Sequence, residues 1–174
     1  LLTDEEALNL PTNCVITKAY FDTQGTDEIV FHGVEYKGNH ISVCMSNTSG
    51  TLWVNLLQLT RPLQLRETPK VDTRVKNITF TKDEIIQFVK DVNDRNRIHR
   101  EVPYIVPGLL ILEYLWTHML NSNAKAGMSI RFLSPMLAND YVFIESQHEG
   151  NVLVGKLDDM ILFKARLHDE HRTN

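Results

Sequence analysis

Three side chains that could act together on a water molecule lie in the segment DRNRIH, residues 94–99. Asp94 carries a carboxylate, Asn96 an amide and His99 an imidazole. A carboxylate and an imidazole that share a water molecule can move its protons as general base and acid. Nine residues after His99, Gly108 opens the most apolar stretch of the chain, GLLILEYLWTHML. We therefore place the candidate site at this junction.

A purely structural interpretation of the same residues stays open from spacing alone. Asp and Asn favour helix ends and turns, so Asp94 and Asn96 could simply end the preceding helix, and His99 could be a loop histidine. Asp91 is a rival for the base, but it belongs to the surface of that helix. Gly108, which follows a proline, is by itself a common helix start.

The elements around this junction indicate a mixed α and β structure. Residues 82–92 have apolar side chains at helical spacing, and Thr81 with Glu84 forms a capping box at their start. The apolar stretch 109–120 predicts a helix that is apolar on nearly every side and has to be covered by other elements. The segments after it with the pattern of antiparallel strands are 128–134, 140–148, 151–157 and 160–168.

The N-terminal part of the chain predicts a β-meander. Its strand-like segments are separated by short connections rich in Gly, Asn, Asp and Thr, as is usual between antiparallel strands. These segments are 14–21, 28–36, 40–46 and 51–59. Pro62 and Pro69 then mark a stretch of mixed polarity. We therefore predict two domains, residues 1–70 and residues 71–174.

Composition argues against several classes of function. The chain has 174 residues, 43% hydrophobic and 23% charged, which is typical of a soluble protein with one large domain or two small layers that share a core. Its net charge is −4 and it has no dense block of basic residues, so nucleic acid is not an expected partner. The longest apolar run is interrupted by Glu113, Thr117 and His118 and is shorter than the roughly 20 residues of a membrane span.

The two cysteines and the first ten residues indicate the cellular compartment of the protein. Cys14 and Cys44 lie in strand-like segments and outside any cysteine or histidine cluster, so neither a metal site nor a disulfide is expected. The opening LLTDEEALNL lacks the basic and extended apolar regions of a secretory signal. These features predict a cytoplasmic protein.

The polar segment and the apolar stretch together resemble the MaoC-like hydratases, the family of the (R)-specific enoyl-CoA hydratases. The motif of that family is Asp-x-Asn-x-x-His, followed by a glycine that opens the central helix. The matching residues here are Asp94, Asn96, His99 and Gly108.

A second signature of the family, Arg-Phe-x-x-Pro followed by a Gly-Asp turn, also has a counterpart. It is similar to Arg131, Phe132 and Pro135, with residues 139–140 as an Asn-Asp turn. The resemblance covers residues 76–170. The order of both signatures around a glycine-opened helix makes the match more specific than the six-residue motif alone.

Two departures from the family pattern concern the loop itself. Arg97 stands where the family usually has proline, which makes the local turn less rigid. Only residues 100–107 fill the gap in which the family has an overhanging segment that shapes the acyl pocket. The acyl-chain specificity of the family is therefore not carried over.

The resemblance implies an α+β hot-dog fold, in which a long central helix is wrapped by an antiparallel sheet. The N-terminal β-meander is then an extra element without a long helix, a degenerate or partial hot-dog half within a degenerate double hot dog. Because an isolated hot-dog domain leaves exposed edge strands, we expect either a homodimer or an internal pairing with the meander.

The resemblance also implies a lyase of fatty acid metabolism, which hydrates enoyl thioesters or dehydrates 3-hydroxyacyl thioesters of coenzyme A or acyl carrier protein. Asp94 would be the principal base and proton shuttle, and His99 would orient the water. Asn96 would support the loop or the Asp94 carboxylate. The backbone N–H of Gly108, at the positive end of the helix, would hold the thioester oxygen.

Four further residues are expected to contact the substrate: Arg97, Arg100, Pro107 and Arg131. Arg97 and Arg100 could hold the phosphates of coenzyme A, although arginines in a loop are more often solvated or paired with nearby acids. No metal or redox cofactor is expected. Coenzyme A or phosphopantetheine enters as part of the substrate.

Two alternative functions stay open. A thioesterase on the same fold would use an acid on the central helix, Glu113, to activate water against the carbonyl. A thioester-binding or assembly subunit would carry the motif without activity. Glu113 and His118 are five residues apart and do not share a helix face, so we expect them at the edge of a pocket or at an interface.

Overall fold

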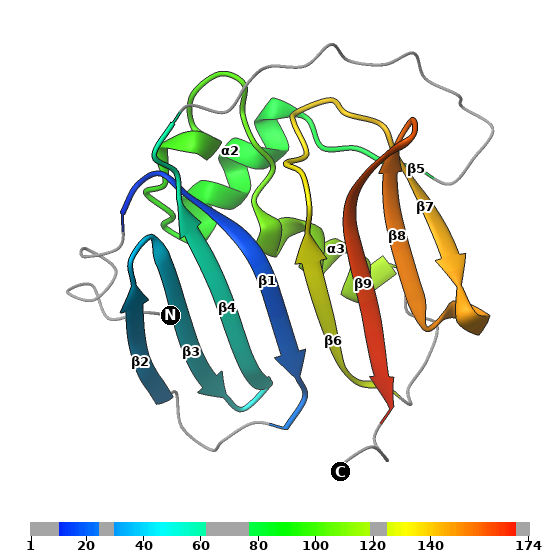
Figure 1. The fold of residues 1–174 in the computed structure, drawn as a ribbon, viewed down its shortest axis with the longest axis horizontal. Coiled ribbons are helices and arrows are strands. Elements are labelled where there is room, and N and C mark those ends of the chain that lie inside the picture. Colours follow the sequence, from blue (N-terminus) through cyan, green and yellow to red (C-terminus); the bar gives the residue numbers. More distant parts are fainter. Residues whose placement is uncertain (1–10, 25–29, 62–76, 119–124, 170–174) are drawn as a thin grey trace.

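The computed structural model describes residues 11–24, 30–61, 77–118 and 125–169. The strands in these ranges form one antiparallel sheet of nine, in the order β2-β3-β4-β1-β6-β9-β8-β7-β5 (Figure 1). This sheet contains strands from both predicted domains. The boundary predicted between them, at residue 70, lies outside the described residues.

The four strands predicted in the N-terminal part are confirmed, with ends within two residues of those expected. They are β1 (Cys14–Asp22), β2 (Val30–Lys37), β3 (His40–Asn47) and β4 (Gly50–Gln58). The alternation of strand faces is clearest in β3, where Ile41 and Val43 are buried and Ser42 is exposed. Gly38, in the turn between β2 and β3, has a φ of 60°, a conformation that glycine adopts without strain.

The four strands predicted after the apolar stretch are confirmed as well. They are β6 (Lys125–Phe132), β7 (Val142–Gln147), β8 (Val152–Leu157) and β9 (Met160–Asp169). A short strand that was not predicted, β5 (Asn77–Ile78), pairs with β7 at the end of the sheet. Two residues are too few to show a periodicity in sequence, so β5 depends on its pairing with β7.

Both predicted helices are present. The first is α2 (Lys82–Asp91), and its predicted capping box is confirmed: Thr81 Oγ1 accepts from the Glu84 N–H at 3.3 Å, and the Thr81 N–H donates to the Glu84 carboxylate at 2.7 Å. The second is α3 (Gly108–His118), which lies behind β6 and β9 in Figure 1. The last two residues of the predicted apolar helix, 119 and 120, lie outside the described residues.

The described part of α3 is less enclosed than its composition predicts. Ile111 and Leu115 are buried, whereas Glu113 and His118 are exposed. The sheet is open, with β2 and β5 at its two ends, so among the described residues it does not surround the helix. In the ranges with described structure, no helix is long and apolar enough to cross a membrane.

The pair β1–β6 joins the N-terminal strands to the C-terminal strands. Ala19 on β1 opposes Ile130 on β6, and both side chains pack in the same core as Leu115 of α3. Outward from this seam, each side places its first strand in chain order, then its fourth, its third and its second. These are β1, β4, β3 and β2 on the N-terminal side and β6, β9, β8 and β7 on the C-terminal side. The internal pairing with the meander, one of the two expected arrangements, is therefore present.

Candidate active site

The loop that carries the motif begins where α2 ends. Asn93 has a φ of 51°, the left-handed conformation that Asn tolerates at a helix end, and it turns the chain away from the helix axis. The Asp94 N–H donates to the Val89 carbonyl at 2.9 Å, and Asp94 Oδ1 accepts from the Asn96 N–H at 2.8 Å. A short 3-10 turn, η1 (Arg97–His99), follows. These local bonds fix the positions of the motif residues relative to the end of α2.

His99 is buried and held in one orientation. Its Nδ1 lies 2.8 Å from the Ile105 carbonyl oxygen, and only 6% of the residue is exposed. Because a carbonyl can only accept, Nδ1 carries the proton and Nε2 presents a lone pair. Burial lowers the pKa of His99, while the Asp94 carboxylate and the Ile105 carbonyl act in the opposite direction. The imidazole is therefore neutral near pH 7 and accepts at Nε2.

Asp94 and His99 come together as the motif predicts. His99 Nε2 lies 3.7 Å from Asp94 Oδ2, and the exposed fractions of the two side chains are 8% and 30%. This separation is longer than a direct hydrogen bond. Two acceptors at this distance can be joined by one water molecule that donates to both. Solvent reaches the pair from the Asp94 side.

Asn96 connects this pair to the N-terminal strands. Its Nδ2 donates to the Cys14 carbonyl at 2.6 Å and contacts His99 Nε2 at 3.3 Å. The opposite orientation of the amide would place its oxygen against the Cys14 carbonyl, two acceptors in contact, so the assignment is well defined. Asn96 Oδ1 is buried and has no partner among the described residues. The amide thus uses both of its N–H groups to hold the loop and His99.

Two backbone carbonyls at the start of β1 anchor the motif loop. Thr12 O accepts from the Arg97 N–H at 2.7 Å, next to the bond between Asn96 and Cys14 O. Neither Thr12 nor Cys14 was predicted to belong to the site. A main-chain acceptor has no side-chain signature, so no residue type could have indicated this role.

Gly108 begins α3 at the seam between the two sets of strands. A Cβ atom at this position would lie 3.1 Å from Ile16 Cβ and 3.1 Å from Phe132 Cε2, which is closer than nearly all real Cβ contacts. The first N–H groups of a helix have no partner within the helix. Gly108 is three residues from Ile105, the partner of His99, so its Cα lies within about 11 Å of the Ile105 Cα. Pro107 is buried beside it.

The predicted arginines do not gather around the Asp94–His99 pair. Arg97 is exposed and forms an ion pair with Glu101 at 3.0 Å. Arg100 is exposed, and its guanidinium donates to the main-chain oxygen of Asp94. Arg131 is exposed on β6, where it opposes Lys18 of β1. Arg100 alone among these arginines has a hydrogen bond to Asp94 in the described structure.

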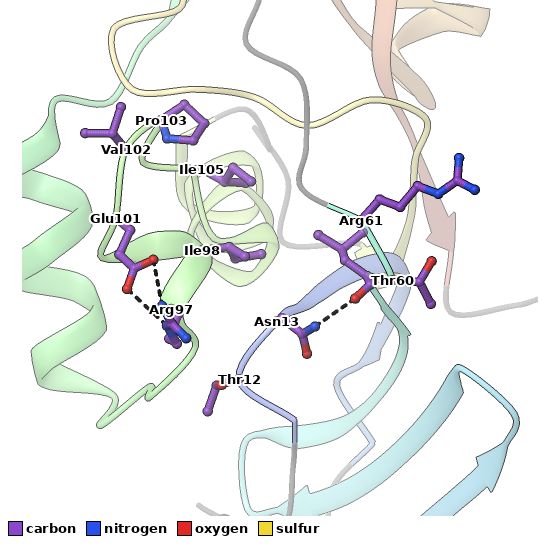
Figure 2. A pocket seen from close by; sticks show the side chains of 11 residues that line it. Thr12, Asn13, Thr60, Arg61, Arg97, Ile98, Glu101, Val102, Pro103 and Ile105 are labelled. Carbon is purple, nitrogen blue, oxygen red and sulfur yellow. Dashed lines mark hydrogen bonds and ion pairs between the residues drawn. The ribbon is translucent and has the colours of Figure 1, made fainter.

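A cavity of about 510 Å³ lies beside the motif loop (Figure 2). Thr12, Asn13 and Thr60 line it from the N-terminal strands, and Ile98 and Ile105 line it from the loop. Asp94, His99 and Gly108 are not among the residues that line this cavity. The Ile98 carbonyl accepts from the Ile105 N–H at 3.1 Å, so the cavity wall is the backbone that holds the imidazole.

The alternative acid, Glu113, is exposed on α3. His118 is exposed one turn later, where its ring stacks on Tyr114 with centroids 4.5 Å apart. Neither residue lines the cavity in Figure 2. Within the ranges that the structure covers, no group of three or more His, Cys, Asp or Glu side chains could hold a metal ion.

No family model matches the chain, and no curated protein matches it. Any relationship is therefore visible at the level of structure.

Solved structures match at low sequence identity. HtdX from Mycobacterium tuberculosis is similar over 92% of this chain and 78% of its own, with 11% identity and a TM-score of 0.66. The full-length peroxisomal multifunctional enzyme type 2 from Drosophila melanogaster matches 88% of this chain and 37% of its own, with 12% identity and a TM-score of 0.55. An acyl-ACP thioesterase from Bacteroides thetaiotaomicron matches 90% and 76%, with 9% identity and a TM-score of 0.50. At these identities the comparison shows the fold alone, and the fold of this chain is the hot-dog fold.

Proposed function

We propose that this protein is a MaoC-like hydratase or dehydratase that acts on enoyl or 3-hydroxyacyl thioesters. The observation that carries the proposal is the 3.7 Å approach of Asp94 Oδ2 and His99 Nε2, with the proton of His99 held on the far nitrogen by Ile105. Two acceptors then face one small gap, which suits a water molecule with two protons to donate. This is the arrangement that a hydration reaction requires at its nucleophile.

In the hydration direction, the water oxygen bonds to the β-carbon of the enoyl thioester while Asp94 Oδ2 takes one water proton. The electron pair of the double bond moves toward the thioester, and the resulting enolate carries its charge on oxygen. The protonated Asp94 then returns the proton to the α-carbon. His99 keeps the water oriented through Nε2 and shares that lone pair with the Asn96 amide. Dehydration is the same sequence in reverse.

The charge on the thioester oxygen needs hydrogen-bond donors at the site. Gly108 supplies a backbone N–H at the first turn of α3, where the helix dipole adds positive potential. A residue with a side chain would push Ile16 and Phe132 apart at this point. Losing one donor of this kind typically costs about 3 kcal/mol of transition-state stabilisation.

The N-terminal strands are, in this proposal, a degenerate hot-dog half that replaces the second hot-dog domain. Three observations support this role: the matching strand order on the two sides of the seam, the β1–β6 pairing, and the anchoring of the loop by Thr12 O and Cys14 O. Homodimerisation would then be unnecessary to complete the sheet at β6. We place the protein in the cytoplasm on the basis of its sequence alone.

The test is an assay with crotonyl-CoA that follows two products at once. Loss of absorbance from the conjugated double bond reports hydration, and free thiol reports thioester hydrolysis. Absorbance loss without thiol is the expected result. Thiol release would support the thioesterase alternative and move the acid to Glu113, and no reaction of either kind would support a binding subunit.

Asp94→Asn is the decisive variant. It keeps an oxygen for the Asn96 N–H but removes the base, so hydration should fall by about 10²- to 10⁴-fold with unchanged circular dichroism. Asp91→Asn is the matched control, because Asp91 is an exposed carboxylate three residues earlier whose Oδ1 accepts from Gln87 at 2.7 Å. An active Asp94→Asn enzyme, or an inactive Asp91→Asn enzyme, would refute the assignment of the base.

A further inference from the structure

The face of the sheet that α3 leaves uncovered carries a cluster of cations at the seam. Lys18 on β1 opposes Arg131 on β6, and Arg131 opposes Lys164 on β9. Neighbouring strands are about 4.8 Å apart, so three positive charges lie in one row within about 10 Å. Arg166 lies two residues beyond Lys164 on the same face of β9. We name these four residues the cation row.

Strand alternation determines the face on which the cation row lies. The next residue along each of the three strands is Ala19, Ile130 or Ala165. These three oppose one another, point into the core and are each 1% exposed. The residues on either side of that buried row therefore point to the opposite face. All four cations are exposed. Figure 1 looks onto this face, with α3 behind β6 and β9.

The cation row has no carboxylate partner within the described ranges. None of its four side chains is in an ion pair there, whereas Lys156, also on this sheet, is paired with Glu145. Like charges directly opposite each other on neighbouring strands destabilise a sheet. The net charge of the chain is −4, so this concentration of cations is local. An anionic ligand would relieve the repulsion.

Aromatic rings extend the cation row on its β4 side. Trp53 on β4 opposes Tyr20 on β1, with ring centroids 5.0 Å apart, and 41% of Trp53 is exposed. Tyr20 is two residues from Lys18 on the same face, and its ring also lies 5.5 Å from that of His168. Exposed aromatic rings of this kind stack on nucleobases. The cation row therefore adjoins an aromatic surface of Trp53 and Tyr20, which we name the stacking platform.

We propose that this face binds the 3′-phosphoadenosine diphosphate part of coenzyme A, with the phosphates at the cation row and the adenine on Trp53. The inference rests on the proposed function and names coenzyme A as the carrier. An acidic carrier protein would match the charges but would make no specific use of the stacking platform. Arg131, which we predict from the sequence to contact substrate, acquires a defined role in this way.

The cation row lies at the same end of β6 as the first turn of α3, where the thioester would react. Arg131 precedes Phe132, the last residue of β6, whose ring lies 3.1 Å from the Cβ position of Gly108 on the inner face. The cation row and the first turn of α3 thus lie on opposite faces of the same end of β6. A pantetheine arm would pass over that end of the strand to bring the thioester to Gly108.

The test measures binding without catalysis. Adenosine 3′,5′-bisphosphate is titrated into the full chain by calorimetry, at low and at high salt. We expect saturable binding that weakens as salt screens the exposed cations. The double variant Arg131→Ala/Lys164→Ala should weaken binding at least about tenfold, since each removes a charged hydrogen-bond donor to phosphate. Trp53→Leu should weaken binding of the bisphosphate more than that of inorganic phosphate.

Lys37→Ala is the matched control, because Lys37 is an exposed cation on β2 of the same sheet. It should leave the affinity unchanged. Absence of bisphosphate binding, binding unaffected by the double variant, or binding of an acidic carrier protein in its place would each overturn the inference. If crotonyl-CoA is hydrated but the bisphosphate does not bind, the nucleotide site fails and the proposed reaction stands. If the bisphosphate binds without hydration, the reaction fails and the site stands.

Discussion

The N-terminal and C-terminal sides of the β1–β6 seam can be compared strand by strand. Outward from the seam they run β1, β4, β3, β2 and β6, β9, β8, β7. In the described ranges, both helices and the motif loop belong to the C-terminal side. The N-terminal side contributes two main-chain acceptors, Thr12 O and Cys14 O. The same strand framework therefore carries the motif loop on one side and anchors it from the other.

The hydrophobic cores of the two sides also differ, and the one that contains α3 is the larger. The buried residues of α3 belong to one large cluster with Met128, Ile130 and Phe163. The N-terminal strands have a separate small cluster of Cys14, Ile41 and Val43. A helix on the inner face adds apolar surface that a sheet alone cannot bury. The C-terminal side should therefore dominate the free energy of unfolding.

Leu115→Ala compared with Ile41→Ala tests that difference most strongly. Both side chains are essentially inaccessible, at 0% and 1% exposed. Removing a buried Leu or Ile side chain costs about 2 to 5 kcal/mol, with the larger losses where the surroundings cannot relax. Urea unfolding should place Leu115→Ala near the upper end and Ile41→Ala near the lower end. Equal or reversed losses would contradict the idea that the helix-covered side is the main core.

Asn96→Ala compared with Asn13→Ala separates support of the loop from general stability. The Nδ2 of each side chain donates to a backbone carbonyl, Asn96 to Cys14 O across the seam and Asn13 to Leu59 O at 2.7 Å. Each loss should cost about 1 kcal/mol, because a partly buried acceptor loses its donor. The hydration rate should fall only in Asn96→Ala. Equal hydration rates in the two variants would show that the link to the N-terminal side does not position His99.

The pH dependence of stability should distinguish the buried histidine from an exposed one. Because burial lowers the pKa of His99 in the folded state, the unfolded chain binds more protons below about pH 6.5. The contribution of neutral His99 is complete above that value, and it is lost as the pH falls from there toward the lower pKa of the folded state. His99→Asn should flatten this part of the stability profile. His40→Asn, at an exposed position on β3, should leave it unchanged.

Arg97→Ala should have the smallest effect on stability. Arg97 and Glu101 form an exposed ion pair on the loop, and exposed ion pairs contribute little to stability because solvent screens them. Thermal unfolding should therefore shift little, and the hydration rate at saturating crotonyl-CoA should be retained. A large rise in KM for crotonyl-CoA would instead place the coenzyme phosphates at this loop and weaken the case for the cation row.

Properties of contiguous residues were predictable from the sequence of this protein. The period of two in β3, the helical spacing in α2 and the capping box at Thr81 all arise from neighbours within a few residues, where backbone geometry sets the pattern. The six-residue spacing of the motif likewise predicted that Asp94 and His99 share one short loop, and the structure brings them to 3.7 Å. The one-sided burial of α3 was not predictable, because the extent of the sheet cannot be inferred from the helix.

Contacts between residues that are far apart in the sequence were decided only by the tertiary structure. The bond from Asn96 to Cys14 O spans 82 residues, and the tautomer of His99 depends on a carbonyl six residues away that a separate turn brings back. The alignment of Lys18, Arg131 and Lys164 depends on the register of two strand pairs. Sequence determined the local elements because their hydrogen bonds and side-chain faces repeat at short range. Tertiary structure determined the site because register and main-chain acceptors have no residue-type signature.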